Sequence, residues 1–164
     1  MNSLKQVVVV RPGDDEERGV DLTPIGRAKA EELAKLIPDK IGKEKKVLLV
    51  TPSDKRSLQT AYIIGKGLGV EPRSLSTLEN RFYENGESQM KQILQFTGGY
   101  DAVVVVAHYT APSGIMNAFR QRFIGLSNKV SRERTPRGTA LYQSLEHGSG
   151  EVTRLPELTP DPID

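Results

Sequence analysis

Three side chains that can hold an anion follow three separate valine-rich runs of the sequence. Arg11 comes directly after the first run, Arg56 lies six residues beyond the second, and His108 comes directly after the third. Arginine presents a planar fork of N–H donors that matches phosphate oxygens, and a protonated imidazole donates from both of its nitrogens. If the chain brings these three residues together, they form a phosphate-binding pocket.

The valine-rich runs predict buried strands, and helical patterns alternate with them. The expected strands are 7–10, 47–50 and 102–107, since short β-branched runs are typical of strands covered on both faces. Helices are expected from Pro24, capped by Thr23, to Pro38; from a cap at Ser53 to Gly65–Gly69; over Ser88–Phe96; and over Ser113–Phe123. We also expect an extended piece near Leu75–Leu78 and a closing hairpin of Ala140–Leu145 and Glu151–Leu155.

Strands that alternate with helices predict an α/β fold with a mostly parallel sheet. Ligands of such sheets bind beyond the carboxyl ends of the strands. Arg11, Arg56 and His108 all follow strands, so we expect them at this one edge. The helix that begins near Ser53 would also direct its free N–H groups at an anion held there.

Composition limits the function classes. The 164 residues suit one domain, expected over 1–156, with a proline-rich acidic tail over 157–164. A net charge of +2 gives no argument for nucleic acid, and the absence of cysteine excludes disulfides and thiolate chemistry. No apolar run is long enough for a signal peptide or a membrane span. We therefore expect a cytoplasmic protein without metal or cofactor.

Four motifs occur in order over about 100 residues. They are Arg11-Pro12-Gly13 after the first strand; Leu22-Thr23, Gly26 and Ala30; Thr51-Pro52, Arg56 and Gln59-Thr60-Ala61; and the valine-rich strand that ends in His108. In this order and spacing they resemble the histidine phosphatase (phosphoglycerate mutase-like) superfamily, and the length of the chain is similar to its compact phosphohistidine-phosphatase branch. The resemblance implies a three-layer α/β/α fold and assigns Arg11, Arg56 and His108 to phosphate binding.

The sequence departs from the family pattern at residues that take part in the family's reaction. Pro12 stands where the family has the histidine that attacks phosphorus, and proline has no side-chain lone pair with which to do so. Tyr109 replaces a small residue after the second histidine. Asn80 stands where many members have an acidic proton donor; Glu79, one residue early, is a weak substitute, and Glu84 and Glu87 are weaker.

Two further features have alternative interpretations. Asp14 and Asp15 could supply a carboxylate nucleophile or bind a divalent ion, although a solvated loop is the ordinary interpretation of such a run. A basic group near the C-terminal third could form a rim that attracts phosphorylated ligands, or simply a solvated surface. Its members are Arg120, Arg122, Lys129, Arg132, Arg134 and Arg137, with only Glu133 opposing them.

These observations leave three functional interpretations. The first is a pseudo-phosphatase that keeps a pocket for phosphate or a phosphorylated ligand or protein but does not turn it over. The second is an active phosphohydrolase with a non-standard nucleophile. The third is a structural or protein-interaction domain with a vestigial pocket. Arg11, Arg56 and His108 favour the first two, and Pro12 favours the first over the second.

Overall fold

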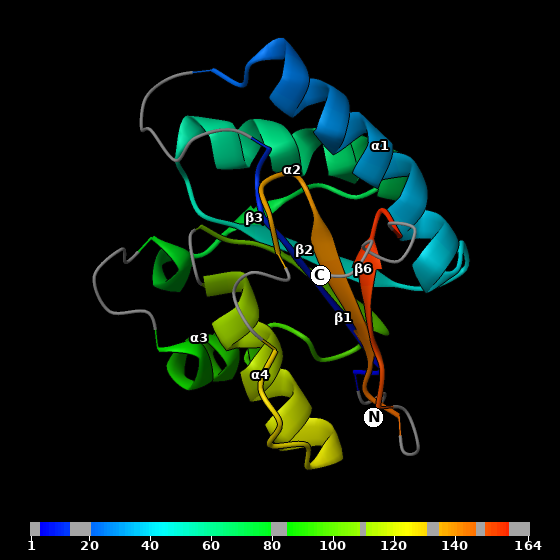
Figure 1. Cartoon of the computed structure of the whole chain (residues 1–164), viewed down its shortest axis with the longest axis vertical. Helices are drawn as coiled ribbons and strands as arrows, with labels where there is room; N and C mark the ends of the chain where they lie inside the picture. The colour runs from blue at the N-terminus through cyan, green and yellow to red at the C-terminus, as the bar shows by residue number, and fades with distance from the viewer. Residues whose placement is uncertain are drawn as a thin grey trace, which may run out of the picture.

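A computed structural model of the chain describes residues 4–13, 21–79, 85–108, 111–130, 135–146 and 150–157. Figure 1 shows the order of the elements along the chain. They are β1 (Gln6–Val10), α1 (Pro24–Ile41), β2 (Val47–Thr51), α2 (Lys55–Leu68), β3 (Arg73–Ser74), the 3-10 turn η1 (Ser76–Leu78), α3 (Gly86–Leu94), β4 (Ala102–Val106), α4 (Ala111–Ile124), β5 (Ala140–Ser144) and β6 (Val152–Leu155).

The described strands form one sheet in the order β3-β2-β4-β1-β5-β6. β1 and β2 flank β4 and run parallel to it, and β3 is parallel to β2. β5 is antiparallel to β1, and β6 is antiparallel to β5. The predicted α/β class, mostly parallel sheet and closing hairpin are therefore confirmed, with the turn of that hairpin at 147–149 outside the described residues.

Helices cover both faces of the sheet, as the valine-rich strands require. Val7 and Val9 belong to a hydrophobic cluster with side chains of α3 and α4, whereas Val8 and Val10 belong to a second cluster with side chains of α1 and α2. All four valines have zero solvent exposure. Figure 1 shows the two helix pairs on opposite sides of the strands, which gives the three layers.

α1 continues past Pro38, contrary to the prediction that the helix stops there. Proline lacks the N–H that would bond to the Ala34 carbonyl, so a helix normally loses stability at this point. Here the carbonyl of Ala34 faces Gly67 of α2, and a Cβ added at Gly67 would overlap that oxygen. The close approach of α2 covers the carbonyl. α1 ends instead at Ile41 and is capped by Gly42, whose N–H donates to the Pro38 carbonyl at 2.9 Å.

Two other local predictions were wrong. Asp54, not Ser53, caps α2, because its carboxylate accepts from the Ser57 N–H at 3.2 Å. The region of Leu75–Leu78 is mainly the 3-10 turn η1, and the extended pairing lies just before it at Arg73–Ser74. The predicted cap at Thr23 is confirmed: its hydroxyl accepts from the Gly26 N–H at 3.1 Å, with Pro24 as the first helical residue.

Candidate functional site

The carboxyl ends of β1, β4 and β2 meet at one edge of the sheet, because these three strands are parallel neighbours. Arg11 directly follows β1, and Arg56 lies in the first turn of α2 after β2. His108 lies two residues beyond β4. The topology thus brings the three predicted residues to the same side of the molecule.

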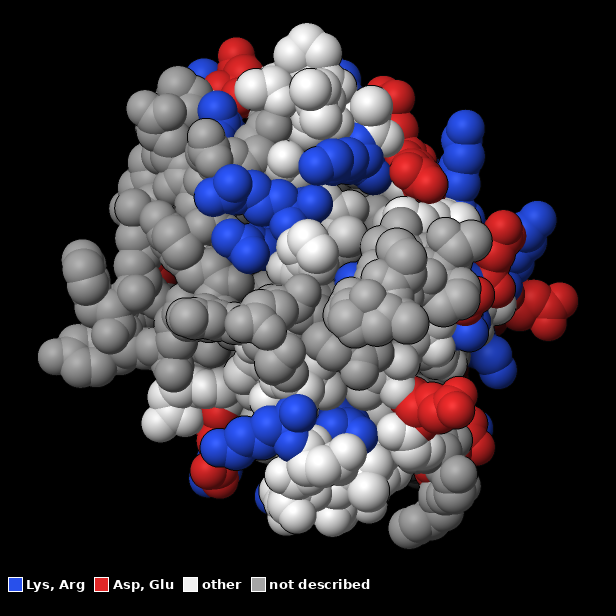
Figure 2. Space-filling model, in the orientation of Figure 1, with Lys and Arg blue, Asp and Glu red and all other residues white. Residues whose placement is uncertain are grey.

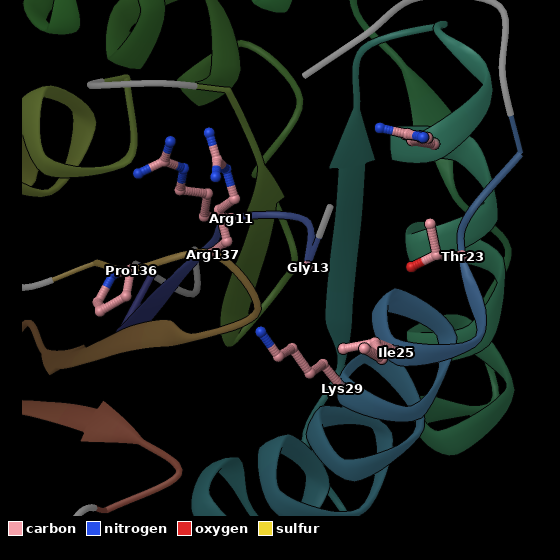
Figure 3. A pocket seen from close by; sticks show the side chains of 8 residues that line it. Arg11, Gly13, Thr23, Ile25, Lys29, Pro136 and Arg137 are labelled. Carbon is pink, nitrogen blue, oxygen red and sulfur yellow. The ribbon is translucent and has the colours of Figure 1, made fainter. Parts of the chain in front are cut away.

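A pocket of about 700 Å³ opens at this edge, and basic side chains dominate its lining (Figure 3). Four cations from four different segments contribute to it, and no carboxylate belongs to its described lining. The lining residues are Arg11, Gly13, Thr23, Ile25, Lys29, Arg56, Pro136 and Arg137. Lys and Arg atoms also gather above the centre of Figure 2, on the side of the molecule where β1 ends. Such a lining suits an anionic ligand.

Arg11 is held against the loop that leads into β5. Its guanidinium donates to the Thr135 carbonyl at 3.4 Å, and its backbone N–H donates to the Thr139 carbonyl at 3.0 Å. The Gly138 N–H in turn donates to the Arg11 carbonyl at 3.0 Å. These bonds join the end of β1 to the loop that carries Arg137, and Figure 3 shows the side chains of Arg11 and Arg137 beside each other.

Arg56 connects α2 to the segment that leads into α1. Its Nε donates to the Asp21 carbonyl at 3.2 Å, and the residue is only 8% exposed. Gln59, one turn later, accepts from the Leu22 N–H at 2.7 Å and donates to the Asp21 carboxylate at 2.8 Å. The hydrogen bond from Gln59 and the charge of Lys55 hold the pKa of Asp21 below its ordinary value. These hydrogen bonds fix the position from which the Arg56 side chain reaches the pocket.

His108 is bound by the first turn of α2. Its Nε2 lies 2.6 Å from Asp54 Oδ1 and 3.1 Å from Ser57 Oγ. Burial acts to raise the pKa of Asp54, but the hydrogen bond and charge of His108 and the bonds from Ser57 outweigh it, so the pKa lies below its ordinary 3.8. His108 is not among the described residues that line the pocket. Its role in anion binding stays a prediction, while its described contacts connect β4 to α2.

Pro12 is buried between two residues that line the pocket, Arg11 and Gly13. Its carbonyl accepts from the Gly138 N–H at 3.2 Å. Pro12 itself is not among the described residues that line the pocket. Because its side chain is a closed hydrocarbon ring, it offers no donor, acceptor or nucleophile beside the pocket. Position 12 thus carries no reactive side-chain group.

The acidic candidates have other contacts or lie outside the described residues. Glu79 accepts from the Ser53 N–H at 3.0 Å, and Glu87 pairs with Lys91 at 3.3 Å on the surface of α3. Neither lines the pocket. Asp14, Asp15, Glu84 and Tyr109 fall outside the described residues, and the part of the chain that is described holds no cluster of three or more His, Cys, Asp or Glu suited to a metal.

The described members of the basic group near the C-terminal third do not form one rim. Arg120 is 3% exposed and points inward, where it donates to Gln143 Oε1 at 3.0 Å and to the Asn128 and Gly150 carbonyls at 2.7 and 3.2 Å. Arg122 is exposed on the groove between α3 and α4, whereas Arg137 lines the pocket at the sheet edge. Arg132 and Arg134 lie outside the described residues.

Lys29, Asp54 and Ser57 are the residues of this region whose roles the sequence did not indicate. Lys29 occupies an ordinary helix position after Gly26, and nothing in its spacing points to a pocket. Arg137 belongs to the basic group for which attraction of phosphorylated ligands is one interpretation, and it is the described member of that group that lines the pocket. Asp54 could have been found, since Asp is a preferred helix cap and directly follows Ser53.

Comparison with solved structures shows which fold this is. A protein of Nakamurella multipartitia, provisionally assigned as the phosphohistidine phosphatase SixA, superposes with a TM-score of 0.65 at 18% identity over 87% of this chain and 86% of that one. The protein histidine phosphatase SixA complexed with tungstate gives 0.62 at 15% identity, over 84% and 86%. The fold is phosphoglycerate mutase-like.

A third similar structure is a mutant phosphoserine phosphatase of Entamoeba histolytica in complex with phosphoserine, with a TM-score of 0.60 at 13% identity over 90% of this chain and 94% of that one. The chain matches no protein-family model and no curated protein sequence. The likeness therefore lies in the fold, and the chemistry has to be argued from the residues of this site. No described helix combines the length and apolar character needed to cross a bilayer.

Proposed function

We propose that this protein is a pseudo-phosphatase: it binds phosphate or a phosphorylated ligand at the sheet edge and does not turn it over. The observation that carries the proposal is the contrast between the pocket and the residue beside it. Arg11, Lys29, Arg56 and Arg137 line the pocket. The neighbouring Pro12, which is buried and is not among the described lining residues, occupies the position that the family motif gives to the nucleophile. Binding requires only the cations, whereas covalent phosphoryl transfer requires a lone pair that Pro12 lacks.

The similar structures support the ligand class. One of them holds tungstate and another holds phosphoserine. Tungstate is a tetrahedral oxyanion like phosphate, so the fold accommodates this shape in those proteins. In this chain Arg11 and Arg56, from the corresponding motifs, contribute to the lining of one pocket.

Ser57 and His108 do not supply a replacement nucleophile. A serine is activated when one histidine nitrogen takes its proton and the other nitrogen holds a carboxylate. Here Ser57 Oγ and Asp54 Oδ1 both contact the same nitrogen, Nε2 of His108. Ser57 also has zero exposure, so a phosphate ester has no access to its hydroxyl. This arrangement favours a structural role over a phosphohydrolase that uses Ser57.

A turnover assay tests the proposal. Purified protein should release no p-nitrophenol from p-nitrophenyl phosphate and no phosphate from a phosphohistidine peptide above the level without protein. The Pro12→His variant is the positive comparison, because loss of a covalent nucleophile commonly costs a factor on the order of 10⁴–10⁶. We expect slow turnover or a trapped phosphohistidine in that variant.

Turnover by the wild-type chain that disappears in Arg56→Ala would reject the pseudo-phosphatase proposal in favour of an active phosphohydrolase. A folded Pro12→His variant that neither binds nor turns over phosphate esters would favour a vestigial pocket in a structural or protein-interaction domain.

A further inference from the structure

A second cavity, of about 590 Å³, opens between α3 and α4 on the face of the sheet opposite α1 and α2. Figure 1 shows α3 and α4 side by side there. The α4 residues that line the cavity share one face of the helix, because they repeat every three or four positions. They are Gly114, Asn117, Ala118, Gln121 and Arg122. We call this cavity the α3–α4 groove, and none of its described lining residues belongs to the pocket at the sheet edge.

Small and apolar residues form the floor of the α3–α4 groove. Gly86 of α3 touches α4, since a Cβ added at Gly86 would overlap the Gly114 carbonyl. The lining also includes Met90, which is buried, and Ala118, whose side chain is a single methyl group. Such a floor can take up an apolar side chain of a ligand.

The loop after α4 holds Lys129 at the groove by fixing its two neighbours. Arg120 donates to the Asn128 carbonyl at 2.7 Å. Asn117 accepts from the Val130 N–H at 2.7 Å and donates to the Val130 carbonyl at 3.1 Å. Lys129 lies between these two fixed residues, lines the groove and is itself exposed.

The rim of the groove is positively charged. Arg122 and Lys129 are exposed, and neither forms a hydrogen bond or an ion pair with any residue that the structure describes. The carboxylate of the described lining, Glu87, is already paired with Lys91 at 3.3 Å. Segments 80–84 and 131–134 flank the lining in sequence outside the described residues. The first contains one arginine and one glutamate, and the second contains two arginines and one glutamate, so neither adds an excess of acid.

An apolar floor beside two cations suits a peptide better than a nucleic acid. Proteins recognise peptide segments in grooves between helices through apolar anchors on the floor and charges at the rim. Nucleic-acid binding commonly neutralises several phosphates, which two cations do not provide.

We propose that the α3–α4 groove is a docking site for an acidic peptide segment of a partner protein. Carboxylates of that segment pair with Arg122 and Lys129, and an apolar side chain of the segment lies against Met90 and Ala118. This inference does not rest on phosphate binding at the sheet edge and adds a second surface to the molecule.

Selection of random peptides displayed on phage, with the immobilised full chain as target, tests this inference. The enriched peptides should carry aspartate or glutamate beside an apolar residue. Fluorescence anisotropy then measures the affinity of the most enriched peptide as a free, labelled molecule. That affinity should fall as the salt concentration rises, because the ion pairs are exposed.

Variants of the groove locate the bound peptide. Arg122→Met and Lys129→Met should each weaken peptide binding about two- to fivefold, as expected for the loss of one exposed ion pair. Gln121→Glu keeps the size of the side chain and adds a carboxylate to the lining, so it should weaken binding by a similar factor.

Two control variants make the same changes outside the groove. Gln92→Glu alters an exposed residue of α3, and Lys66→Met alters an exposed residue of α2. Neither residue lines the groove. Both variants should bind the peptide as wild type does.

Three results would overturn the inference. The first is a selection that enriches no peptide, or only peptides without acidic residues. The second is peptide binding that the groove variants leave unchanged or that the control variants weaken equally. The third is binding that is lost in Arg56→Ala but kept in the groove variants, which would place the acidic peptide in the pocket at the sheet edge. Phosphate binding is measured separately, so each of the two proposals can fail without the other.

Discussion

The two carboxylate oxygens of Asp54 make different contacts. Oδ2 caps α2 through the Ser57 N–H, and Oδ1 holds His108 at 2.6 Å. Asp54→Asn separates them, because asparagine also caps helices well but carries no charge. We expect the variant to lose about 1.5–3 kcal/mol of unfolding free energy at neutral pH, the range for hydrogen bonds to charged groups.

The pH dependence of this contact follows from the lowered pKa of Asp54. A carboxyl whose folded pKa lies below its unfolded value stabilises the fold above the unfolded pKa, here near 3.8, and that stability is lost as the pH falls through the folded pKa. Urea unfolding at neutral pH and below pH 4 measures it. The gap between wild type and Asp54→Asn should narrow in acid, and a gap that stays constant would show that His108 does not use the charge.

Arg120 shows how a basic residue can be structural. It is buried and bonds to Gln143, Asn128 and Gly150. Arg120→Met removes these donors and should cost about 1.5–3 kcal/mol in urea unfolding. The exposed Arg122→Met on the same helix should change stability by less than about 0.5 kcal/mol. Equal effects of the two variants would place Arg120 on the surface instead.

At the scale of elements, the contact of α1 with α2 depends on Gly67. An added Cβ would overlap the Ala34 carbonyl, which Pro38 leaves without its helical donor. We expect Gly67→Ala to lower the free energy of unfolding by about 1–3 kcal/mol, as overpacking commonly does. Gly98→Ala is the control, because nothing lies within 4 Å of the added atom. A neutral Gly67→Ala would mean that the helices are not this close.

The elements were predictable where one local signal decides them. Short apolar runs that contain valine identified β1, β2 and β4, and Thr23-Pro24 identified the start of α1. The end of α1 was not predictable, because a contact from α2, more than twenty residues away, permits the helix to pass Pro38. The local sequence also does not decide which of two adjacent residues caps a helix, as Ser53 and Asp54 show.

The candidate site was predictable only in part, for a similar reason. Parallel topology is enough to bring the ends of β1, β2 and β4 to one edge, so Arg11 and Arg56 reach the same pocket. Lys29 and Arg137 arrive there through packing of α1 and of the loop before β5, which no spacing in the sequence encodes. The contact of His108 with Asp54 depends on the position of α2 relative to β4.

Over the whole molecule the net charge is small, but positive side chains are concentrated at one pocket. The chain has a net charge of only +2, yet four cations line one pocket. Phosphate that binds there should stabilise the fold, by about 1.4 kcal/mol at ten times its dissociation constant. Urea unfolding with phosphate, against chloride at matched ionic strength, measures this. Arg11→Ala should lose the stabilisation, and an equal gain in that variant would indicate a general salt effect instead.

In the proposed function, Arg11 and Arg56 together hold a phosphate, and calorimetric titration with phosphate measures this binding. Wild type should bind with millimolar or tighter affinity, and Arg11→Ala or Arg56→Ala should each weaken binding roughly tenfold or more. Arg27→Ala, an exposed arginine of α1 outside the pocket, should bind as wild type does. Absence of binding by wild type, or undiminished binding in both pocket variants, would contradict the account.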